Sequence, residues 1–248
     1  MAQVPQHNDL IIGGGKMARH WGFYLQSLGT PATFWNRSNS VKTKPRELSA
    51  YFNNFSTVYL AISDDALKEF YETYLTEFSG SVFHFSGAFY HPEIAGIHPL
   101  MTFGKDLYPA DFYKGIPLTL DFSSKNSFIA SLPNPQYTVS PKDKALYHSF
   151  CVIAGNFPQW LWQNVFTEFE KLNIPKAALQ PFLQQSLDNT FKTGDENFSG
   201  PLLRNDQITL ARHQEALDGH HLLQIYSAFV EAAKKNSLPA SPTSQEFQ

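Results

Sequence analysis

Short apolar runs and amphipathic stretches alternate along the first part of the chain. Runs rich in β-branched and aromatic residues, bounded by glycine, proline or polar residues, predict strands. Apolar side chains spaced three or four residues apart predict helices over 16–28 and 64–78, and the polar stretch 41–54 predicts a short helix with loop. The predicted strands are 9–12, 31–38, 56–62, 81–85, 116–122 and 136–140. Because strands and helices alternate, the pattern predicts an α/β fold with a parallel sheet.

The pattern changes near Pro141, after which helical periodicity continues without a strand signal. It predicts one long or broken helix over 144–172, another over 177–192, and a third and fourth within 207–235. The polar residues 236–248 are expected to fray. The chain is therefore predicted to have an N-terminal α/β domain, residues 1–140, and a C-terminal all-α domain, residues 141–248.

Two local features add to this outline. Pro99 restricts the residue before it to extended conformations, so 96–104 is expected to be mostly loop. A glycine-rich turn joins the first strand to the first helix, and Gly13, Gly15 and Ala18 match the pattern G-x-G-x-x-A in the strand–turn–helix context that a dinucleotide-binding turn requires.

The chemistry of this turn follows from its small residues. The first glycine allows a tight turn, the second lets a pyrophosphate approach the backbone, and the alanine lets helix and strand pack closely. The free amides and positive dipole end of the helix, where Lys16 and Met17 lie, then hold the phosphates. We expect a Rossmann-like domain, while a glycine turn without ligand remains the alternative.

The end of the second strand indicates which cofactor binds. An acidic residue roughly 20 positions after the glycines would bind the ribose 2′-hydroxyl of NAD. The chain has Asn36, Arg37 and Ser38 there instead. An arginine fork and a hydroxyl can bind a 2′-phosphate through charge-assisted hydrogen bonds, so we expect NADP(H) rather than NAD(H). The alternative is that Arg37 is a solvated loop cation.

Ligands of α/β sheets bind beyond the carboxyl ends of the strands. Ser63 and Asp64 follow the third predicted strand, and Ser86 and Gly87 follow the fourth. We expect these four residues to contribute to cofactor binding. Together with the loop that contains His98 they would surround the nicotinamide, with the helical domain as the other wall of the cleft.

Two groups of polar residues stand out in the helical half. His148 and Asn156 lie two turns apart on the first helix and therefore near one face. The second group is Asn189, Arg204, Asp206, Thr209 and His213.

These groups resemble the motifs of a known family, Rossmann-like proteins joined to the helical domain of unknown function 2520. That family has a His then an Asn on the first helix, a Leu-x-Asn on the next, and a Gly-Pro-x-x-Arg-Gly-Asp segment followed by Thr and His. Asn205 stands where the family has glycine, and asparagine also tolerates positive φ. The matching residues are His148, Asn156, Leu187–Asn189, Gly200–Pro201, Arg204, Asp206, Thr209 and His213, with 84–88 and 98–103 resembling the family's His-x-Ser-Gly and His-Pro-Leu segments.

More distantly, the layout is similar to ketopantoate reductase, pyrroline-5-carboxylate reductase and prephenate dehydrogenase. Those enzymes reduce or oxidise small carbonyl, imine or hydroxy compounds between a Rossmann domain and a helical domain. The resemblance implies an NADP(H)-dependent oxidoreductase and does not name its substrate. In ketopantoate reductase the corresponding first helix carries a catalytic lysine, and here His148 takes a comparable place. The absence of that lysine favours the alternative, a non-catalytic NADP-binding sensor or scaffold protein.

Hydride transfer needs a group that handles a proton at the reacting atom, and the ordinary pKa of histidine suits this role. His148 is the first candidate and His98 the second, with Asn156 and Asn189 orienting the substrate. Either histidine could instead be a hydrogen-bonded structural residue, and Asn156 could belong to a helix kink.

The remaining candidates would bind the substrate. Arg204 and Asp206 could position a substrate carboxylate, with an Arg–Asp ion pair at a helix start as the equally supported alternative. His213 is expected on the cleft side of the same helix, where it too could be structural.

Composition narrows the function classes. The chain has 248 residues, a formal net charge of −3 and a pI near 6.3, which gives no electrostatic reason to expect nucleic acid or an anionic membrane as partner. A single cysteine, Cys151, excludes an internal disulfide and indicates a reducing compartment. With neither a signal peptide nor a long apolar run, the sequence predicts a cytoplasmic protein.

No metal site is predicted, because the neighbouring His220 and His221 cannot share one helix face and no tight carboxylate or thiolate set accompanies the other histidines. A helix that is apolar all round must be buried, so we expect a homodimer through the helical domain. The apolar residues on nearly all sides of that helix are Phe157, Trp160, Leu161, Trp162, Val165 and Phe166.

Overall fold

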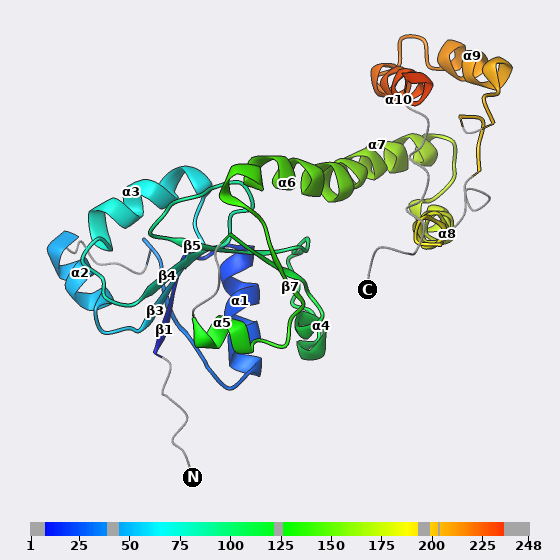
Figure 1. The fold of residues 1–248 in the computed structure, drawn as a ribbon. Helices are drawn as coiled ribbons and strands as arrows, with labels where there is room; N and C mark the ends of the chain where they lie inside the picture. The colour runs from blue at the N-terminus through cyan, green and yellow to red at the C-terminus, as the bar shows by residue number, and fades with distance from the viewer. Residues whose placement is uncertain (1–7, 39–44, 122–125, 193–198, 203, 236–248) are drawn as a thin grey trace, which may run out of the picture. The chain divides into compact units, whose positions relative to one another are not determined.

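A computed structural model describes residues 8–38, 45–121, 126–192, 199–202 and 204–235. The chain divides into two compact units, Met1–Trp162 and Gln163–Gln248, and each is described by itself below (Figure 1). The change from strands to helices falls where the sequence predicts it, since the last strand ends at Thr138 and a 3₁₀ turn, η1 (Pro141–Asp143), follows. The first compact unit extends beyond that point, into α7 (Phe157–Lys171).

The first unit is built on a seven-stranded sheet in the order β2-β1-β3-β4-β5-β6-β7. Neighbouring strands run parallel except for the β5–β6 pair, where His98 lies opposite Thr119 in an antiparallel register. This architecture confirms the α/β fold class with a mostly parallel Rossmann-like sheet. The strands are β1 (Asp9–Ile12), β2 (Thr33–Trp35), β3 (Thr57–Leu60), β4 (Ser81–His84), β5 (Ala95–Pro99), β6 (Leu118–Leu120) and β7 (Gln136–Thr138).

Helices cover both faces of this sheet (Figure 1). Alternate strand residues such as Ile11, Tyr59 and Phe83 pack with α1 (Lys16–Ser27), α4 (Ala110–Lys114) and α5 (Ser127–Ser131). The strand residues between them, such as Leu10 and Val58, pack with α2 (Pro45–Phe52) and α3 (Asp64–Tyr74). Burial on both faces explains why these strands are continuous apolar runs rather than alternating patterns.

Two details differ from the sequence expectation. Residues 96–104 are not mostly loop, because Ala95–Pro99 forms β5. Proline does restrict His98 to extended conformations, but a strand is itself extended, and Pro99 closes β5 as its last residue. The sheet is also not wholly parallel, since β6 reverses against β5, and the hydrophobic pattern of a strand carries no information on its direction.

The predicted long helix is a continuous helical stretch with an internal change of pitch. α6 (Lys144–Cys151) passes into a π-helical segment, η2 (Val152–Asn156), and then into α7. Pro158 lies just after the π-helical segment and cannot donate the amide hydrogen bond of a regular α-helix. A local π-helical segment is one way to accommodate this missing donor.

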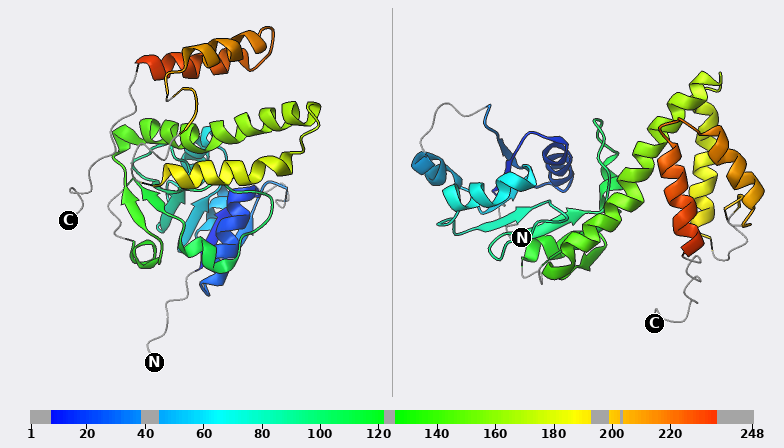
Figure 2. Two further views of the ribbon diagram at one scale, coloured as in Figure 1. Left: turned by 90° about the vertical axis from the view of Figure 1, so that its right-hand side faces the viewer. Right: turned by 90° about the horizontal axis from the view of Figure 1, so that it is seen from above.

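The second unit continues α7 and adds η3 (Lys176–Leu179), α8 (Gln180–Thr190), α9 (Gln207–Ala216) and α10 (Leu223–Lys235). α9 and α10 lie side by side (Figure 2). Asn205, before α9, has φ of 53°, a conformation that asparagine tolerates better than most residues. Within the described residues, none of the helices is long and apolar enough to span a membrane.

Candidate functional site

The glycine turn is shaped around the end of β3. The Gly13 amide donates to the carbonyl of Trp35 at 2.9 Å, and the Ala61 amide donates to the carbonyl of Ile12 at 2.8 Å. Gly13 has φ of 133°, and a Cβ atom there would lie 2.1 Å from the Ala61 carbonyl oxygen. Only glycine can therefore occupy this position.

The start of α1 presents its backbone amides without a side-chain cap. Gly15 is the N-cap residue in an extended conformation, no cap hydrogen bond reaches the helix start from a described side chain, and its first turn has no acidic residue. A Cβ atom on Gly15 would meet none of the described residues beyond its chain neighbours within 4 Å. Ala18 is fully buried on the strand-facing side of the same helix. Uncapped amides at the positive end of a twelve-residue helix are suited to bind an anion.

A cavity of about 940 Å³ opens in front of this helix start, between the ends of β1, β2 and β3. β1 has β2 on one side and β3 on the other, and chain connections reverse direction at such a point of an α/β sheet, where ligands bind. The cavity brings together most of the residues predicted to bind a cofactor. These are Gly13, Gly15, Lys16, Met17, Asn36, Arg37, Ser38 and Ser63.

The end of β2 supplies no carboxylate to this cavity. The Ser38 amide donates to Oδ1 of Asn36 at 2.9 Å, which holds the turn after the strand. Arg37 and Ser38 are exposed and line the cavity wall. Their guanidinium and hydroxyl groups suit a phosphate better than they suit a ribose hydroxyl.

A smaller cavity of about 220 Å³ adjoins the first and shares Met17, Ala61 and Ile62 with it. Asp64 and Ser86, which were also predicted to bind the cofactor, line this second cavity. The Ser86 hydroxyl donates to Oδ2 of Asp64 at 2.5 Å and accepts from the amide of Phe89 at 2.9 Å. The ends of β3 and β4 are therefore tied together at the cavity wall.

Both candidate histidines lie at this end of the sheet, within the first unit. His98 lines the small cavity, and the ring of His148 is nearly perpendicular to it, with centroids 5.6 Å apart. Gly87 makes room for this pair, because a Cβ atom there would lie 2.5 Å from Cδ2 of His148 and 3.1 Å from Cδ2 of His98. Gly87 therefore lies beside the histidines rather than in the large cavity.

Tyr147 is a residue of this site that sequence reasoning missed. Nδ1 of His98 is 2.8 Å from the Tyr147 hydroxyl, which is in turn 2.9 Å from Oγ1 of Thr119. Burial lowers the pKa of His98 to about 4, helped by the neighbouring charges of His148 and Lys144, and burial raises the pKa of Tyr147 to about 12. Both groups are neutral at pH 7. In the sequence, the only indication that Tyr147 lies near the site is its position directly before His148.

Lys144 is a buried lysine on the same helix as His148. It begins α6, is 4% exposed, and its Nζ lies 2.6 Å from Oδ2 of Asp121 and 3.3 Å from the Ser86 carbonyl oxygen. Oδ1 of Asp121 accepts from the Gly96 amide at 2.7 Å. Burial is also the main reason why the pKa of the neighbouring His84 falls to about 4. The ion pair fixes α6, and with it His148, to the sheet.

Replacing Asp121 by alanine is expected to destabilise the first unit by about 3–5 kcal/mol, because it leaves the Lys144 charge buried and unpaired. Urea unfolding followed by tryptophan fluorescence would measure the change. The matched control is Asp111→Ala, which breaks an exposed ion pair with Lys114 of 2.7 Å. That control should change the free energy of unfolding far less, because solvent screens an exposed ion pair. Equal effects of the two substitutions would show that the Lys144 pair does not hold α6.

The two asparagines predicted to orient the substrate lie on different helical segments. Asn156 ends η2 and is exposed in the first unit. Asn189 lies on α8 of the second unit, where it accepts from Gln185 at 2.8 Å and from Lys192 at 2.9 Å. The predicted role of Asn189 in orienting a substrate stays a prediction.

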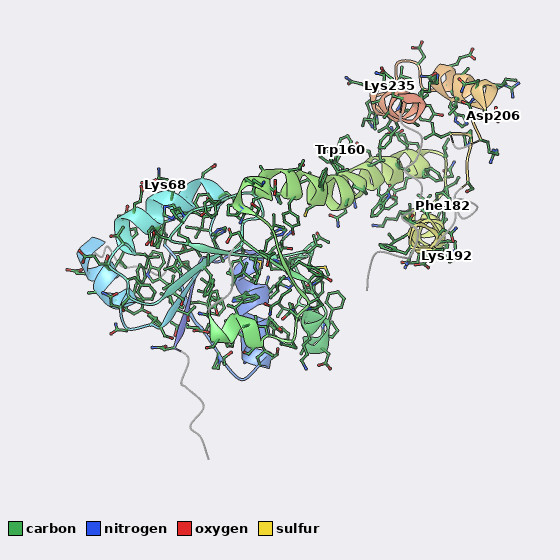
Figure 3. The ribbon with its side chains drawn as sticks, viewed as in Figure 1. Lys68, Trp160, Phe182, Lys192, Asp206 and Lys235 are labelled. Carbon is green, nitrogen blue, oxygen red and sulfur yellow. The ribbon has the colours of Figure 1, made fainter. Side chains whose placement is uncertain are left out.

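Asp206 caps α9 (Figure 3). Its carboxylate accepts from the amide of Thr209 at 3.0 Å and from its hydroxyl at 2.7 Å, and these bonds lower the pKa of Asp206. Arg204 is exposed beside it, and Nδ1 of His213 lies 2.9 Å from the Tyr226 hydroxyl. Capping accounts for Asp206 locally, and substrate binding by these three residues stays a prediction.

Comparison with known families confirms the predicted resemblance for the second half of the chain. Residues 121–233 match the family described as domain of unknown function DUF2520. No curated protein matches the chain.

Solved structures with the same fold span nearly the whole chain. A Bacteroides fragilis protein named as an NADP oxidoreductase matches with a TM-score of 0.73 and 18% identity, over 93% of this chain and 98% of that one. An imine reductase from Streptomyces aurantiacus matches with a TM-score of 0.63 and 10% identity, over 92% and 93%. Pyrroline carboxylate reductase from Plasmodium falciparum, solved with NADP bound, matches with a TM-score of 0.57 and 12% identity, over 92% and 96%. At these identities the likeness establishes the fold.

Proposed function

We propose that this chain, which carries the DUF2520 domain at residues 121–233, is an NADP(H)-dependent oxidoreductase of a small carbonyl, imine or hydroxy substrate. One observation carries the proposal. A cavity of about 940 Å³ over an uncapped helix start leads, through Met17, Ala61 and Ile62, into a smaller cavity lined by a histidine. The first cavity fits a dinucleotide and the second fits its reacting end with a small substrate.

Each part of the large cavity has a separate role in holding the cofactor. The amides at the start of α1 bind the pyrophosphate, which Gly15 allows to approach because it has no side chain. Arg37 and Ser38 bind the 2′-phosphate that distinguishes NADP(H) from NAD(H). A bound NADPH would supply hydride chemistry, and the chain's own residues must then handle the proton.

His148 is the group that handles this proton in our proposal, and His98 lies beside it. His98 has Nδ1 committed to Tyr147, so its Nε2 is the ring nitrogen left for the substrate. It is neutral at pH 7 because its pKa is lowered to about 4, and so it acts by hydrogen bonding rather than as an acid. His148 is the general acid in this proposal, and Gly87 lets it approach His98 closely.

The class of substrate is supported by the structural relatives, two of which are named as an imine reductase and a pyrroline carboxylate reductase. This activity can be tested directly by incubating the protein with NADPH and a panel of cyclic imines and small 2-oxo acids. Oxidation of NADPH is then measured as a loss of its absorbance. If the chain binds NADPH but turns over no compound of the screen, the alternative function is favoured, a non-catalytic NADP-binding sensor or scaffold protein. Cys151, the single cysteine, agrees with a protein of the reducing cytoplasm.

Arg37→Ala is expected to weaken NADPH binding by about 1.5–3 kcal/mol and to leave NADH binding nearly unchanged, because only NADPH carries the 2′-phosphate. Calorimetric titration of both cofactors measures this difference. Arg19→Ala is the matched control, since Arg19 is an exposed arginine on α1 that donates to the Lys105 carbonyl, outside the cavity. Equal affinity of the wild-type chain for NADPH and NADH would contradict the assignment of Arg37.

We further propose that the chain forms a homodimer through its helical part. In the described part of the second unit only three apolar side chains are buried, Leu179, Leu210 and Val230. Large apolar side chains are exposed instead, including Phe182 at 65% (Figure 3) and Ile208 at 70%. Large exposed apolar side chains favour burial in a protein interface, and a second copy of the same chain presents side chains of the same chemistry.

Sedimentation of the full chain at micromolar concentration should therefore give about twice the monomer mass of 28.1 kDa. Phe182→Glu places a charge on this surface and should shift the equilibrium toward monomer. Phe34→Glu, at an apolar side chain that is 44% exposed in the first unit, is the control and should leave the mass unchanged. A wild-type chain that sediments as a monomer would contradict the proposal.

A further inference from the structure

Three potential metal ligands meet in the second unit. Glu168 lies on α7, and His220 and His221 lie in the connection between α9 and α10. One ligand atom from each residue lies within 4.8 Å of the other two. The sequence predicts no metal site here, because two adjacent histidines on a helix cannot share one face. The structure places both outside the helices, where their rings stack with centroids 4.4 Å apart.

We propose that Glu168, His220 and His221 bind a divalent transition-metal ion of the Zn²⁺ class. Two imidazole nitrogens and a carboxylate oxygen are a ligand set that Zn²⁺ accepts, with water in the fourth position. Nε2 of His220 and Oε2 of Glu168 are 3.2 Å apart. Two ligand atoms at about 2.0–2.1 Å from a tetrahedral Zn²⁺ lie about 3.3 Å apart, so these two atoms already have the spacing that the ion needs.

The third ligand can reach the ion by a side-chain movement. His221 is exposed and belongs to a turn, so its ring can rotate toward the other two ligands without disturbing packed residues. The side chains of His220 and Glu168 are 29% and 21% exposed. The ligands are thus held by the fold and remain open to an ion from solution.

Two existing interactions must yield to the ion. Nζ of Lys171 lies 2.8 Å from Oε2 of Glu168, but the lysine side chain is 64% exposed and can move into solvent. The Leu222 amide donates to Nδ1 of His220 at 3.2 Å, which places the proton of the neutral ring on Nε2. Binding at Nε2 moves that proton to Nδ1 and breaks this contact. An ion with high affinity for imidazole can replace both interactions, whereas Mg²⁺ and Ca²⁺, which prefer oxygen ligands, cannot.

The ion would join α7 to the connection between α9 and α10. The described part of this unit has few buried apolar side chains, so a crosslink between its helices would add substantially to its stability. Because the site forms in the folded state, metal binding is coupled to folding.

Titration calorimetry of the full chain, freed of any histidine tag, tests the site with ZnCl₂ and with CaCl₂. We expect saturable binding of about one Zn²⁺ per chain and no binding of Ca²⁺. His220→Ala and Glu168→Gln should each weaken Zn²⁺ binding by at least about tenfold. His213→Ala, which removes another histidine of the second unit, is the matched control and should leave Zn²⁺ affinity unchanged.

Lys171 supplies a test in the opposite direction. Lys171→Met should strengthen Zn²⁺ binding because it removes the cation that competes for Glu168. Lys235→Met removes a comparable exposed lysine, paired with Glu231 at 2.6 Å, and should have no effect.

Thermal unfolding supplies the final measurement. Zn²⁺ should raise the unfolding temperature of the wild-type chain but not that of His220→Ala. Absence of saturable Zn²⁺ binding, or binding that persists in both His220→Ala and Glu168→Gln, overturns the proposal. NADPH titration is independent of this outcome, because the residues proposed to hold the dinucleotide belong to the first unit.

Discussion

Gly15→Val is expected to abolish NADPH binding while the chain remains folded. The backbone of Gly15 is extended, with φ of −77° and ψ of −174°, which valine adopts without strain. Apart from its chain neighbours, no described residue lies within 4 Å of a Cβ atom there, so the new side chain would extend into the space before the α1 amides. That space is where the pyrophosphate binds in our proposal. Calorimetric titration with NADPH should show at least about a 100-fold loss of affinity.

Gly13→Ala should behave in the opposite way and destabilise the fold itself. Its φ of 133° is strained for any residue with a Cβ atom, and that atom would overlap the Ala61 carbonyl oxygen at 2.1 Å. Strain of this kind costs about 1–3 kcal/mol before the overlap is counted, so we expect a loss of about 3 kcal/mol or more on urea unfolding. Gly13 is thus expected to be needed for the fold, and Gly15 for binding of the cofactor.

The pair of variants is informative because each serves as the other's control. A folded Gly15→Val chain with unchanged NADPH affinity would show that the turn is structural only. Normal stability of Gly13→Ala would show that the close approach of the turn to β3 is not maintained in solution. Circular dichroism of both variants establishes which of them is folded before the titrations are interpreted.

His148→Ala is expected to lower turnover by roughly 10²–10⁴-fold once a substrate is found, with NADPH affinity nearly unchanged. The reason is that the large cavity lies in front of α1, and His148 is not among its lining residues. His98→Ala should also lower turnover, but for a different reason, because a neutral histidine with a pKa near 4 forms a hydrogen bond with the substrate and does not release a proton at pH 7.

The pH dependence distinguishes the two histidines. Loss of the general acid should change the pH dependence of the rate, whereas loss of a neutral hydrogen-bonding residue should lower the rate without changing its pH dependence. Tyr147→Phe keeps the ring beside His98 but removes the hydroxyl that holds Nδ1, and it should have a smaller effect than His98→Ala. His91→Ala, at a histidine that lines neither of the two cavities, is the control. Wild-type rates in His148→Ala would remove His148 from the mechanism.

The sequence by itself determined the elements that depend on local chemistry. The glycine turn was identifiable because a tight turn, a close backbone approach and a packed helix start each require a small residue at a fixed spacing, here Gly13, Gly15 and Ala18. A parallel sheet could be predicted because strands and helices alternate along the chain. The lack of a carboxylate after β2 was equally local, since it depends only on Asn36, Arg37 and Ser38 following the strand.

The tertiary structure alone decided which distant residues meet. Asp121 and Lys144 form a buried ion pair although nothing in their sequence context marks either one, because burial depends on what packs around a residue and not on its neighbours in the chain. Tyr147 became part of the site through contacts with β5 and β6, whose antiparallel pairing places His98 opposite Thr119. The direction of a strand and the position of a turn such as that of His220 and His221 are set by long-range packing. No pattern of hydrophobic and polar residues encodes them.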